Sequence, residues 1–343
     1  MASVVMADDG VAFDGAMAET GPLGGAETAF VALAEALAAR GHDVRAFTRC
    51  TAPLRHKGVV WSPIASGDVP RSCDLYIGNR GHRLIGLVPR PKRRVLWLHN
   101  PATYLRKPRI AARIAWYRPL IVTTGAYHAS TIPPWIVDGG RRVIPYGVLD
   151  RFRRGEPREP PPPRAIFTSN PLRGLNWLLD LWVARIRPAM PQAELHIYAG
   201  TAVYGGMTKH AGEIEAVLTR AGALEYQGVR RHAPVGREQL VEMLTQARAM
   251  LYRGDPGETF CLALAEAQAL GVPAVVTPLG SVGERVADGL SGRVAHSDDD
   301  FVAAAIAVLL DDTLWRLWHH GALHAQRGLS WDEVAAGYEA LIP

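Results

Sequence analysis

The chain has 343 residues, a formal net charge of +5, 48% hydrophobic residues and 21% charged residues. Because a single core rarely grows beyond about 250–300 residues, this length favours two domains, and the apolar content excludes a chain that is disordered throughout. There is no apolar run of the roughly 18–20 residues that span a membrane, no basic segment typical of a signal peptide, and only three widely spaced cysteines, so we expect a cytoplasmic protein without a disulfide framework.

Positive charge is concentrated in the first half of the chain. Residues 1–163 carry a net charge of +10, and residues 164–343 a net charge of −5. Between Asp74 and Asp138 there are eleven Lys or Arg residues and no acidic residue. Such a field attracts phosphates, anionic lipids or nucleic acid, but no nucleic-acid-binding motif accompanies it. Residues 106–117 have the pattern of a basic amphipathic helix, so the region 80–118 is either a peripheral membrane contact or a solvated basic face.

In the first half, short apolar runs predict strands that alternate with helix-like segments. This alternation is typical of βαβ units with parallel sheets. The predicted strands are 44–48, 75–78, 95–99, 120–124 and 143–145, and one of the predicted helices is 27–40.

The second half repeats the alternation. Its predicted strands are 164–168, 194–198, 249–252, 274–277 and 292–294, and its predicted helices are 175–187, 237–247, 262–270 and 300–310. Between the halves, four consecutive prolines at 160–163 form a stiff extended connector, because proline continues neither a helix nor a central strand. We therefore predict a first domain over 1–155, a linker over 156–163 and a second domain over 164–325. Doubly wound domains bind ligands outside the carboxyl ends of their strands.

A glycine-rich segment, residues 21–25, precedes the predicted helix 27–40. Glycines let the backbone approach an anion, and a helix N-terminus presents free N–H groups to it. The spacing matches neither the dinucleotide-binding G-x-G-x-x-G pattern nor a P-loop. Gly24 and Gly25 are candidate anion-binding residues, and a plain turn into a helix is the alternative.

Two glutamates distinguish the second half. Glu258 follows a predicted strand and a turn, where the two oxygens of a carboxylate can accept hydrogen bonds from a diol. Glu266 falls within a helix of small apolar residues, where an unpaired carboxylate is costly. The structural alternative is that Glu258 caps the helix and Glu266 meets an arginine.

An Asp-x-Asp pattern at 298–300 raises the question of a metal. Such a pair can hold a divalent ion, but here it stands at the start of the predicted helix 300–310. Capping and complementarity to the helix dipole explain acidic residues at that place. We expect no metal site.

Several motifs, in order, resemble the retaining glycosyltransferases of family 4 (glycosyl transferases group 1). Residues 24–27 are similar to the family's first loop, and residues 143–152 to its exit from the first domain. Residues 226–229 resemble its F-x-G strand, residues 258–266 its E-x7-E region, and residues 279–292 its G-G-x-x-E element. The resemblance covers nearly the whole chain. It implies the α/β GT-B fold, two doubly wound Rossmann-like domains facing a cleft, with residues 326–343 crossing back onto the first domain.

The resemblance also implies roles for individual residues toward a nucleotide-diphosphate sugar (UDP or GDP). Glu258 would contact hydroxyls of the donor sugar, and Glu266 those of the ribose. His99, at the end of the predicted strand 95–99, would meet the donor sugar as a catalytic residue. Apart from the resemblance, Tyr127 and His128 follow the predicted strand 120–124 and are a candidate pair on the acceptor side. The remaining donor-binding residues would be Gly24, Gly25, Gly228, Val229 and the backbone N–H groups of Thr259, Phe260, Cys261 and Leu262.

The leaving diphosphate needs positive charge, because negative charge develops there in the transition state. Arg173 fits the family's phosphate-binding lysine and can grip phosphate oxygens in bidentate fashion. The family's second cation is missing at Ser169 and Asn170, so Arg253 or another arginine would have to replace it.

The implied activity is transfer of the sugar, without metal or cofactor, to a glycan or lipid-linked acceptor in the synthesis of cell-surface polysaccharide or glycolipid. The enzyme would work in the cytoplasm, with peripheral contact to the inner face of the membrane. Two alternatives stay open. One is a catalytically weakened nucleotide-sugar-binding partner protein, because of the missing cation. The other is a sugar-nucleotide epimerase or a phosphorylase, although none of the four lysines lies in a convincing cofactor motif.

Overall fold

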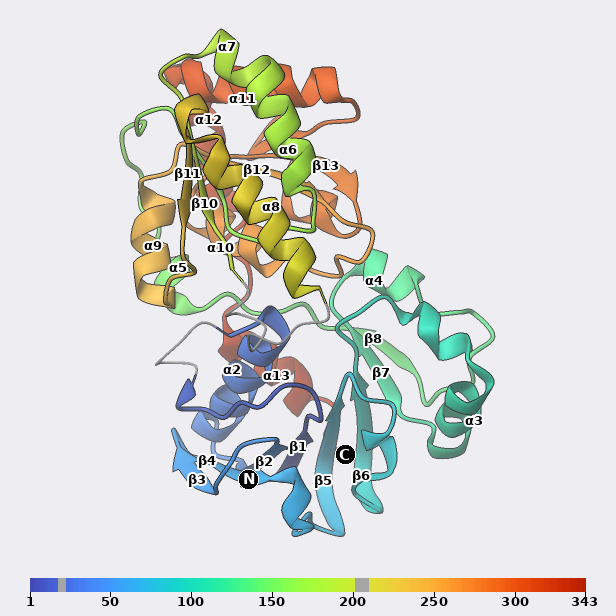
Figure 1. The fold of residues 1–343 in the computed structure, drawn as a ribbon. Coiled ribbons are helices and arrows are strands. Elements are labelled where there is room, and N and C mark those ends of the chain that lie inside the picture. The colour runs from blue at the N-terminus through green and yellow to red at the C-terminus, as the bar shows by residue number, and fades with distance from the viewer. Residues whose placement is uncertain (18–22, 201–209) are drawn as a thin grey trace. The chain divides into compact units, whose positions relative to one another are not determined.

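The computed structural model describes residues 1–17, 23–200 and 210–343, which divide into two compact units (Figure 1). The first unit comprises Met1–Gly147 and Leu329–Pro343, and the second comprises Val148–Gly328. Each unit is a largely parallel sheet with helices, which confirms the predicted α/β class with two doubly wound domains.

The first unit contains an eight-stranded sheet in the order β3-β4-β2-β1-β5-β6-β7-β8. Neighbouring strands are parallel, apart from the antiparallel pair of β3 and β4. Strands β1, β3 and β4 are additions to the strands expected from the sequence. The bounds are β1 (Ser3–Ala7), β2 (Asp43–Thr48), β3 (Leu54–His56), β4 (Val59–Pro63), β5 (Ser72–Asn79), β6 (Arg90–Trp97), β7 (Leu120–Thr123) and β8 (Arg141–Val143).

The helices of the first unit are α2 (Gly25–Ala39), α3 (Pro108–Tyr117), α4 (Ala126–Ser130) and α13 (Trp331–Glu339). Although α13 is the last helix of the chain, it lies beside α2 (Figure 1). Arg40, which follows α2, pairs with Glu339 at 2.5 Å and with Asp332 at 2.9 Å. A capping box between Ser330 and Glu333 starts α13. These contacts hold the end of the chain on the first unit.

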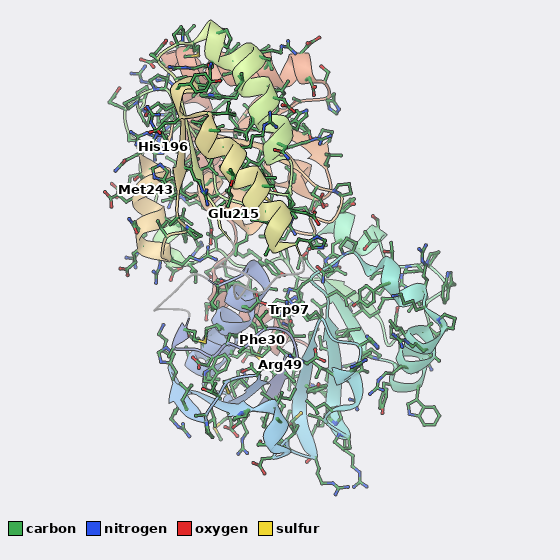
Figure 2. The ribbon with its side chains drawn as sticks, in the orientation of Figure 1. Phe30, Arg49, Trp97, His196, Glu215 and Met243 are labelled. Carbon is green, nitrogen blue, oxygen red and sulfur yellow. The ribbon has the colours of Figure 1, made fainter. Side chains whose placement is uncertain are left out.

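The core of the first unit lies on both faces of its sheet. Consecutive residues of a strand point to opposite faces, and at the end of β6 the buried Trp97 contacts Tyr338 of α13, with ring centroids 5.5 Å apart. Leu96 belongs instead to a buried cluster with Ile110 and Ile114 of α3. On α2, Phe30 packs edge-on against Phe13, with ring centroids 5.4 Å apart. Figure 2 marks Phe30 and Trp97.

The second unit contains a six-stranded, wholly parallel sheet in the order β11-β10-β9-β12-β13-β14. The chain first winds outward from β9 to β11 and then returns to the other side of β9 with β12. The bounds are β9 (Arg164–Phe167), β10 (Glu194–Tyr198), β11 (Val229–His232), β12 (Ala249–Gly254), β13 (Ala274–Leu279) and β14 (Gly292–Val294).

The α-helices of the second unit lie before, between and after these strands. They are α5 (Asp150–Arg153), α6 (Leu175–Leu181), α7 (Arg187–Ala189), α8 (Ala211–Ala223), α9 (Arg237–Thr245), α10 (Leu262–Ala269), α11 (Asp298–Leu310) and α12 (Asp312–Ala325). A π-helical turn over Trp182–Ile186 joins α6 to α7. Among the described residues, no helix combines the length and the apolar composition that crossing a bilayer requires.

The proline-rich segment packs on the second unit. The backbone N–H of Arg158 donates to His319 Nε2 at 3.2 Å, and its guanidinium donates to the Leu270 carbonyl at 2.7 Å. Arg248 donates to the Pro161 carbonyl at 3.0 Å. The units therefore divide at 147/148 and 328/329 instead of at the predicted 155/156 and 325/326, and residues 156–163 belong to the second unit.

Candidate functional site

The strand order of the second unit reverses between β9 and β12. In doubly wound sheets, ligands bind outside the carboxyl ends of the strands at such a reversal. The loop after β9 carries Ser169 and Arg173, and the loop after β12 carries Glu258 and leads into α10. The topology therefore places the predicted carboxylate and the predicted cation at the same edge of one sheet.

Arg173 and Glu258 are in direct contact. Arg173 Nη1 lies 2.7 Å from both carboxylate oxygens of Glu258. The loop that presents Arg173 is fixed by Asn170, whose carbonyl accepts the Arg173 N–H at 2.9 Å and whose side chain accepts the Leu172 N–H at 3.0 Å. Only 5% of Glu258 is exposed. The two groups that the sequence assigned to different parts of a donor are thus paired with each other.

Two hydrogen bonds in series hold the Glu258 carboxylate in position. The hydroxyl of Tyr252, in β12, donates to Glu258 Oε2 at 2.7 Å, and Ser169 Oγ donates to the Tyr252 oxygen at 3.1 Å. Tyr252 is fully buried, and burial raises the pKa of its phenol well above 10, so the group stays a donor at neutral pH. Sequence reasoning missed Tyr252, although it ends the predicted strand 249–252, and regarded Ser169 only as the place of a missing cation.

The N-terminus of α10 follows Glu258. Thr259, Phe260 and Cys261 are all buried, and Cys261, the N-cap residue, has a φ of 64° without a capping hydrogen bond from its side chain. The first N–H groups of a helix have no partner within it, so this end favours an anion. Burial, together with the charge of Glu258, raises the pKa of the Cys261 thiol well above its usual range, so the sulfur stays neutral.

Glu266 lies inside α10 and has a separate partner. Its Oε1 is 2.5 Å from Nη1 of Arg237, the first residue of α9. Burial raises the pKa of Glu266, and the guanidinium opposes this shift. The arginine contact anticipated by the structural alternative is therefore present. Glu258 and Glu266 are held by different arginines, one in the loop after β9 and the other at the start of α9.

Gly228 and Val229 lie away from this cluster. They stand at the amino end of β11, whereas the cluster is at the carboxyl ends of β9 and β12, and the sheet is parallel. Gly228 has a φ of 75°, and a Cβ there would come within 2.7 Å of the Ala193 carbonyl oxygen. The side chain of Val229 is fully buried in the core. The structure thus gives both residues a part in the start of β11.

In the first unit, a second polar cluster lies where β1, β5 and β6 end. Asp8 Oδ2 accepts hydrogen bonds from Asn79 Nδ2 at 2.5 Å and from Arg80 Nε at 2.9 Å. Arg80 also pairs with Glu27, in the first turn of α2, at 2.6 Å. Burial opposes the charge of Arg80, but Glu27 and Asp8 outweigh this effect and raise its pKa. Sequence reasoning missed Asp8, Asn79 and Arg80; Asn79 directly follows the predicted strand 75–78, which was the available signal.

His99 belongs to this cluster. It lies two residues after β6 and is 8% exposed. Its Nδ1 contacts the Tyr146 hydroxyl, and its Nε2 contacts Asn79 Oδ1. Burial, with the nearby Arg80 and His128, holds the pKa of His99 well below 6.5. The ring is therefore neutral at pH 7, with both nitrogens engaged by side chains of its own unit.

His128, the candidate on the acceptor side, is also engaged at both ring nitrogens. Nδ1 accepts the Thr124 N–H at 3.2 Å, and Nε2 lies 3.0 Å from the Asn100 carbonyl, to which it donates. Burial lowers its pKa to about 4. These contacts give His128 a structural part in joining the ends of β6 and β7.

The glycine-rich loop leads into α2. Gly21 lies outside the described residues. Gly24 is the N-cap of α2, with its carbonyl accepting the Thr28 N–H at 2.9 Å. Among the described residues, a Cβ built on Gly25 would have no neighbour within 4 Å. The described part of the chain therefore leaves space beside Gly25.

The Asp-x-Asp segment starts α11. Ser297 caps the helix by accepting the Asp300 N–H at 3.1 Å, so the cap is the serine and the three aspartates form the first turn. Asp299 pairs with Arg185 at 2.8 Å, and Asp300 with Arg293 at 3.0 Å. No grouping of three potential metal ligands occurs within residues 1–17, 23–200 and 210–343.

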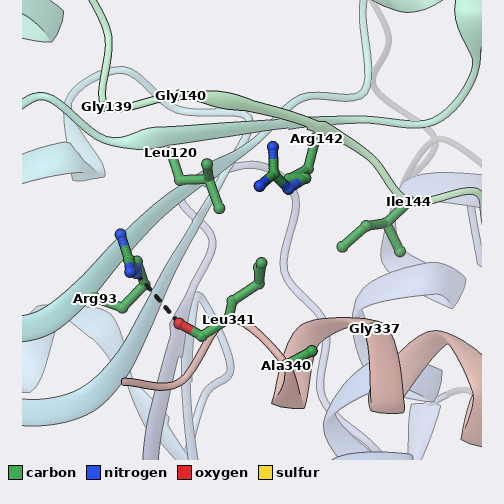
Figure 3. A pocket seen from close by; sticks show the side chains of 9 residues that line it. All are labelled: Arg93, Leu120, Gly139, Gly140, Arg142, Ile144, Gly337, Ala340 and Leu341. Carbon is green, nitrogen blue, oxygen red and sulfur yellow. Dashed lines mark hydrogen bonds between the residues drawn. The ribbon is translucent and has the colours of Figure 1, made fainter.

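A cavity of about 350 Å³ lies elsewhere in the first unit (Figure 3). It contains none of the predicted site residues. Its lining combines apolar side chains and glycines with two arginines: Arg93, Leu120, Gly139, Gly140, Arg142, Ile144, Gly337, Ala340 and Leu341.

Comparison with known proteins gives a family-model match that lies within the second unit. Residues 163–312 match the family model described as Glycosyl transferases group 1. D-inositol 3-phosphate glycosyltransferase of Streptomyces coelicolor is 35% identical over 136 residues, which cover 38% of this chain and 28% of that protein. The enzyme of the same name from Xylanimonas cellulosilytica is 32% identical over 126 residues, covering 36% and 30%. The matched segments thus span less than a third of these two relatives.

Solved structures resemble the whole chain. Sucrose-phosphate synthase from Thermosynechococcus elongatus has a TM-score of 0.71 at 15% identity, covering 99% of this chain and 98% of that one. WaaG, a glycosyltransferase involved in lipopolysaccharide biosynthesis, has a TM-score of 0.67 at 16% identity, with 99% of both chains covered. Trehalose-6-phosphate synthase OtsA has a TM-score of 0.74 at 10% identity, with 98% of both covered. The chain therefore has the α/β GT-B fold, and its residues 163–312 are similar to the glycosyl transferases of group 1.

Proposed function

We propose that the protein is a retaining glycosyltransferase that moves a sugar from UDP or GDP to a glycan or lipid-linked acceptor. The observation that carries the proposal is the contact of Arg173 with Glu258 beside the N-terminus of α10. A carboxylate suited to sugar hydroxyls, a guanidinium suited to phosphate and a helix end suited to an anion meet at one switch point.

In the proposed reaction, the acceptor hydroxyl oxygen forms a bond to the anomeric carbon on the face from which the diphosphate departs. The bond from the anomeric carbon to the phosphate oxygen breaks, and the leaving phosphate takes the acceptor proton. Arg173 leaves Glu258 to bind the phosphate, aided by N–H groups at the start of α10, and Glu258 accepts hydrogen bonds from the sugar. Glu266 would take the ribose hydroxyls, and fixed positive charge would make a metal ion unnecessary.

A second candidate is a nucleotide-sugar-binding partner protein with weakened catalysis. This candidate is favoured because Ser169 and Asn170 are neutral at the place of the family's second cation. Their side chains also already form hydrogen bonds, Ser169 with Tyr252 and Asn170 with the Leu172 N–H. Such a protein would bind a donor without turning it over.

We also propose that the first unit contacts the inner face of an anionic membrane through α3. Ile110 and Ile114 of this helix are buried, whereas Trp116 is 81% exposed. The exposed Arg106, Lys107 and Arg109 precede or begin α3. Tryptophan and basic side chains favour a lipid–water interface.

Sedimentation with vesicles tests this surface. Wild-type protein should bind vesicles that contain phosphatidylglycerol but not vesicles of phosphatidylcholine alone. Replacing Arg106, Lys107 and Arg109 together by glutamine should abolish binding, and unchanged binding would contradict the proposal.

The test of the activity is donor binding and release of nucleoside diphosphate across a panel of nucleotide sugars, with and without crude glycolipid acceptor. Glu258→Ala should abolish turnover. Glu215→Ala is the matched control, because Glu215 lies on α8 (Figure 2) and pairs with Arg231 at 3.0 Å. Turnover retained by Glu258→Ala would refute the assignment, and donor binding without turnover in the wild type would favour the partner protein.

A further inference from the structure

The leaving diphosphate of the proposed reaction carries more negative charge than one arginine neutralises. Ser169 stands at the place of the family's second cation, and its hydroxyl already has a partner. Ser169 Oγ donates to Tyr252, which donates to Glu258. Ser169 is therefore part of the support of the carboxylate, and the second positive charge has to come from another element.

Arg237, Arg253 and Arg285 each lie at or after the carboxyl end of a strand of this sheet. Arg237 is paired with the buried Glu266 at 2.5 Å, so moving it would leave a buried carboxylate uncompensated. Arg253, at the end of β12, is exposed, and its guanidinium carbon lies 5.3 Å from the centre of the Trp177 ring. Arg285 ends the short helix Val282–Arg285, which follows β13 and contacts α10.

Arg285 is held beside the start of α10. Its guanidinium carbon lies 4.5 Å from the ring centre of Phe260, two residues before α10 begins. Only 19% of its side chain is exposed, and burial lowers its pKa, so its charge is poorly solvated. Burial raises the pKa of the Cys261 thiol, and the charges of both Arg173 and Arg285 oppose this shift.

Among the described residues, Arg285 has one side-chain ion pair and a buried Nε without a hydrogen-bond partner. Its single carboxylate contact among the described residues is the neighbouring Glu284, at 3.4 Å. Its buried Nε has no partner within residues 1–17, 23–200 and 210–343. A guanidinium has five N–H donors in a planar fork that matches phosphate oxygens. A poorly solvated cation with spare donors gains more from an incoming anion than the exposed Arg253 does.

We propose that Arg285 supplies the second positive charge of the diphosphate site, acting with Arg173 at the N-terminus of α10. This assignment rests on the proposed function. It places the two cations in loops after different strands, β9 and β13, with the end of α10 contacting the segment that holds Arg285. Arg285 would contact only the phosphates, and other residues would bind the nucleoside.

Titration calorimetry with UDP and GDP, and ligand-detected NMR with uridine and guanosine, tests the assignment on the full chain. Arg285→Met keeps an unbranched side chain against Phe260 but removes the positive charge. Arg285→Lys keeps the positive charge but lacks the planar guanidinium and its multiple N–H donors. Arg253→Met is the matched control. Arg285→Met should weaken binding of the preferred nucleoside diphosphate about 10- to 100-fold, the range expected for hydrogen bonds to a charged group, and leave nucleoside binding unchanged. Arg285→Lys should lose less, and Arg253→Met should stay within about twofold.

The proposal is overturned if Arg285→Met binds the nucleoside diphosphate as the wild type does, if it loses nucleoside and diphosphate equally, or if Arg253→Met shows the selective loss instead. Should Arg285→Met unfold, Arg285→Lys decides: unchanged affinity for the diphosphate overturns the assignment, and a selective loss supports it. Failure of the wild type to bind either nucleoside diphosphate would refute the proposed function itself, which separates the two failures.

Discussion

Replacing Tyr252 by phenylalanine removes a single oxygen atom from the support of Glu258. The side chain is fully buried, and its hydroxyl donates to Glu258 Oε2 at 2.7 Å while accepting from Ser169 at 3.1 Å. Phenylalanine fills the same space. In the proposed reaction Arg173 moves from Glu258 to the phosphate, and the phenol then remains as the group that keeps the carboxylate in place.

The size of the effect follows from the chemistry of this contact. A hydrogen bond to a charged group contributes about 1.5–3 kcal/mol, and each 1.4 kcal/mol is a tenfold change in rate. Tyr252→Phe should therefore lower kcat/KM for donor turnover about 10- to 100-fold. Ser169→Ala removes only a neutral bond, of about 0.5–1.5 kcal/mol, and should lower kcat/KM about 2- to 10-fold.

The assay is release of nucleoside diphosphate, with kcat and KM determined separately and the free energy of unfolding measured for each variant. Tyr76→Phe is the matched control, since Tyr76 is another fully buried tyrosine, in β5, whose hydroxyl donates to the Leu84 carbonyl at 2.6 Å. It should lose stability and keep kcat/KM. The positioning role is refuted if Tyr252→Phe and Tyr76→Phe have the same effect on turnover, or if Tyr252→Phe alters stability alone.

Three further predictions concern stability and are checked by urea unfolding. Glu266→Leu should cost about 3 kcal/mol because it leaves the charge of Arg237 without its buried partner, and adding Arg237→Met should recover much of this loss; an additive double mutant would contradict the coupling. His128 has a pKa of about 4 in the folded protein and of 6.5 in the unfolded chain, so the unfolded state binds more protons between these pH values. The free energy of unfolding should therefore fall as the pH drops from 6.5 to 4, by at most about 3 kcal/mol. NMR titration of the His128 ring should show a neutral imidazole at pH 5, and His128→Gln should flatten the pH dependence of stability. Cys261 has a φ of 64°, which costs an L-residue about 1–2 kcal/mol, so Cys261→Gly should be more stable than Cys261→Ala, and the reverse order would show that the left-handed backbone is not strained.

Much of the fold could be read from the sequence because its signal is local. The apolar runs at 44–48, 164–168 and 274–277 became β2, β9 and β13 with bounds that differ by at most two residues. Strand β3 (Leu-Arg-His) was missed because it contains no apolar run. Strands β1 and β4 were missed although their runs are as long as those that were predicted. The helix α12 was missed as well, although Asp311 caps it with hydrogen bonds to Thr313 and Leu314.

The sequence by itself determined which residue types follow the strands, and hence the prediction that Glu258, Glu266 and Arg173 bear on function. The tertiary structure decided which of them meet. Arg173 and Glu258 are 85 positions apart, and their contact depends on β12 returning beside β9, which no local pattern encodes. Tyr252 and Arg285 gained their importance in the same way. A strand order and a side-chain contact are set by packing over long sequence separations, whereas strand and helix formation is largely set by neighbouring residues.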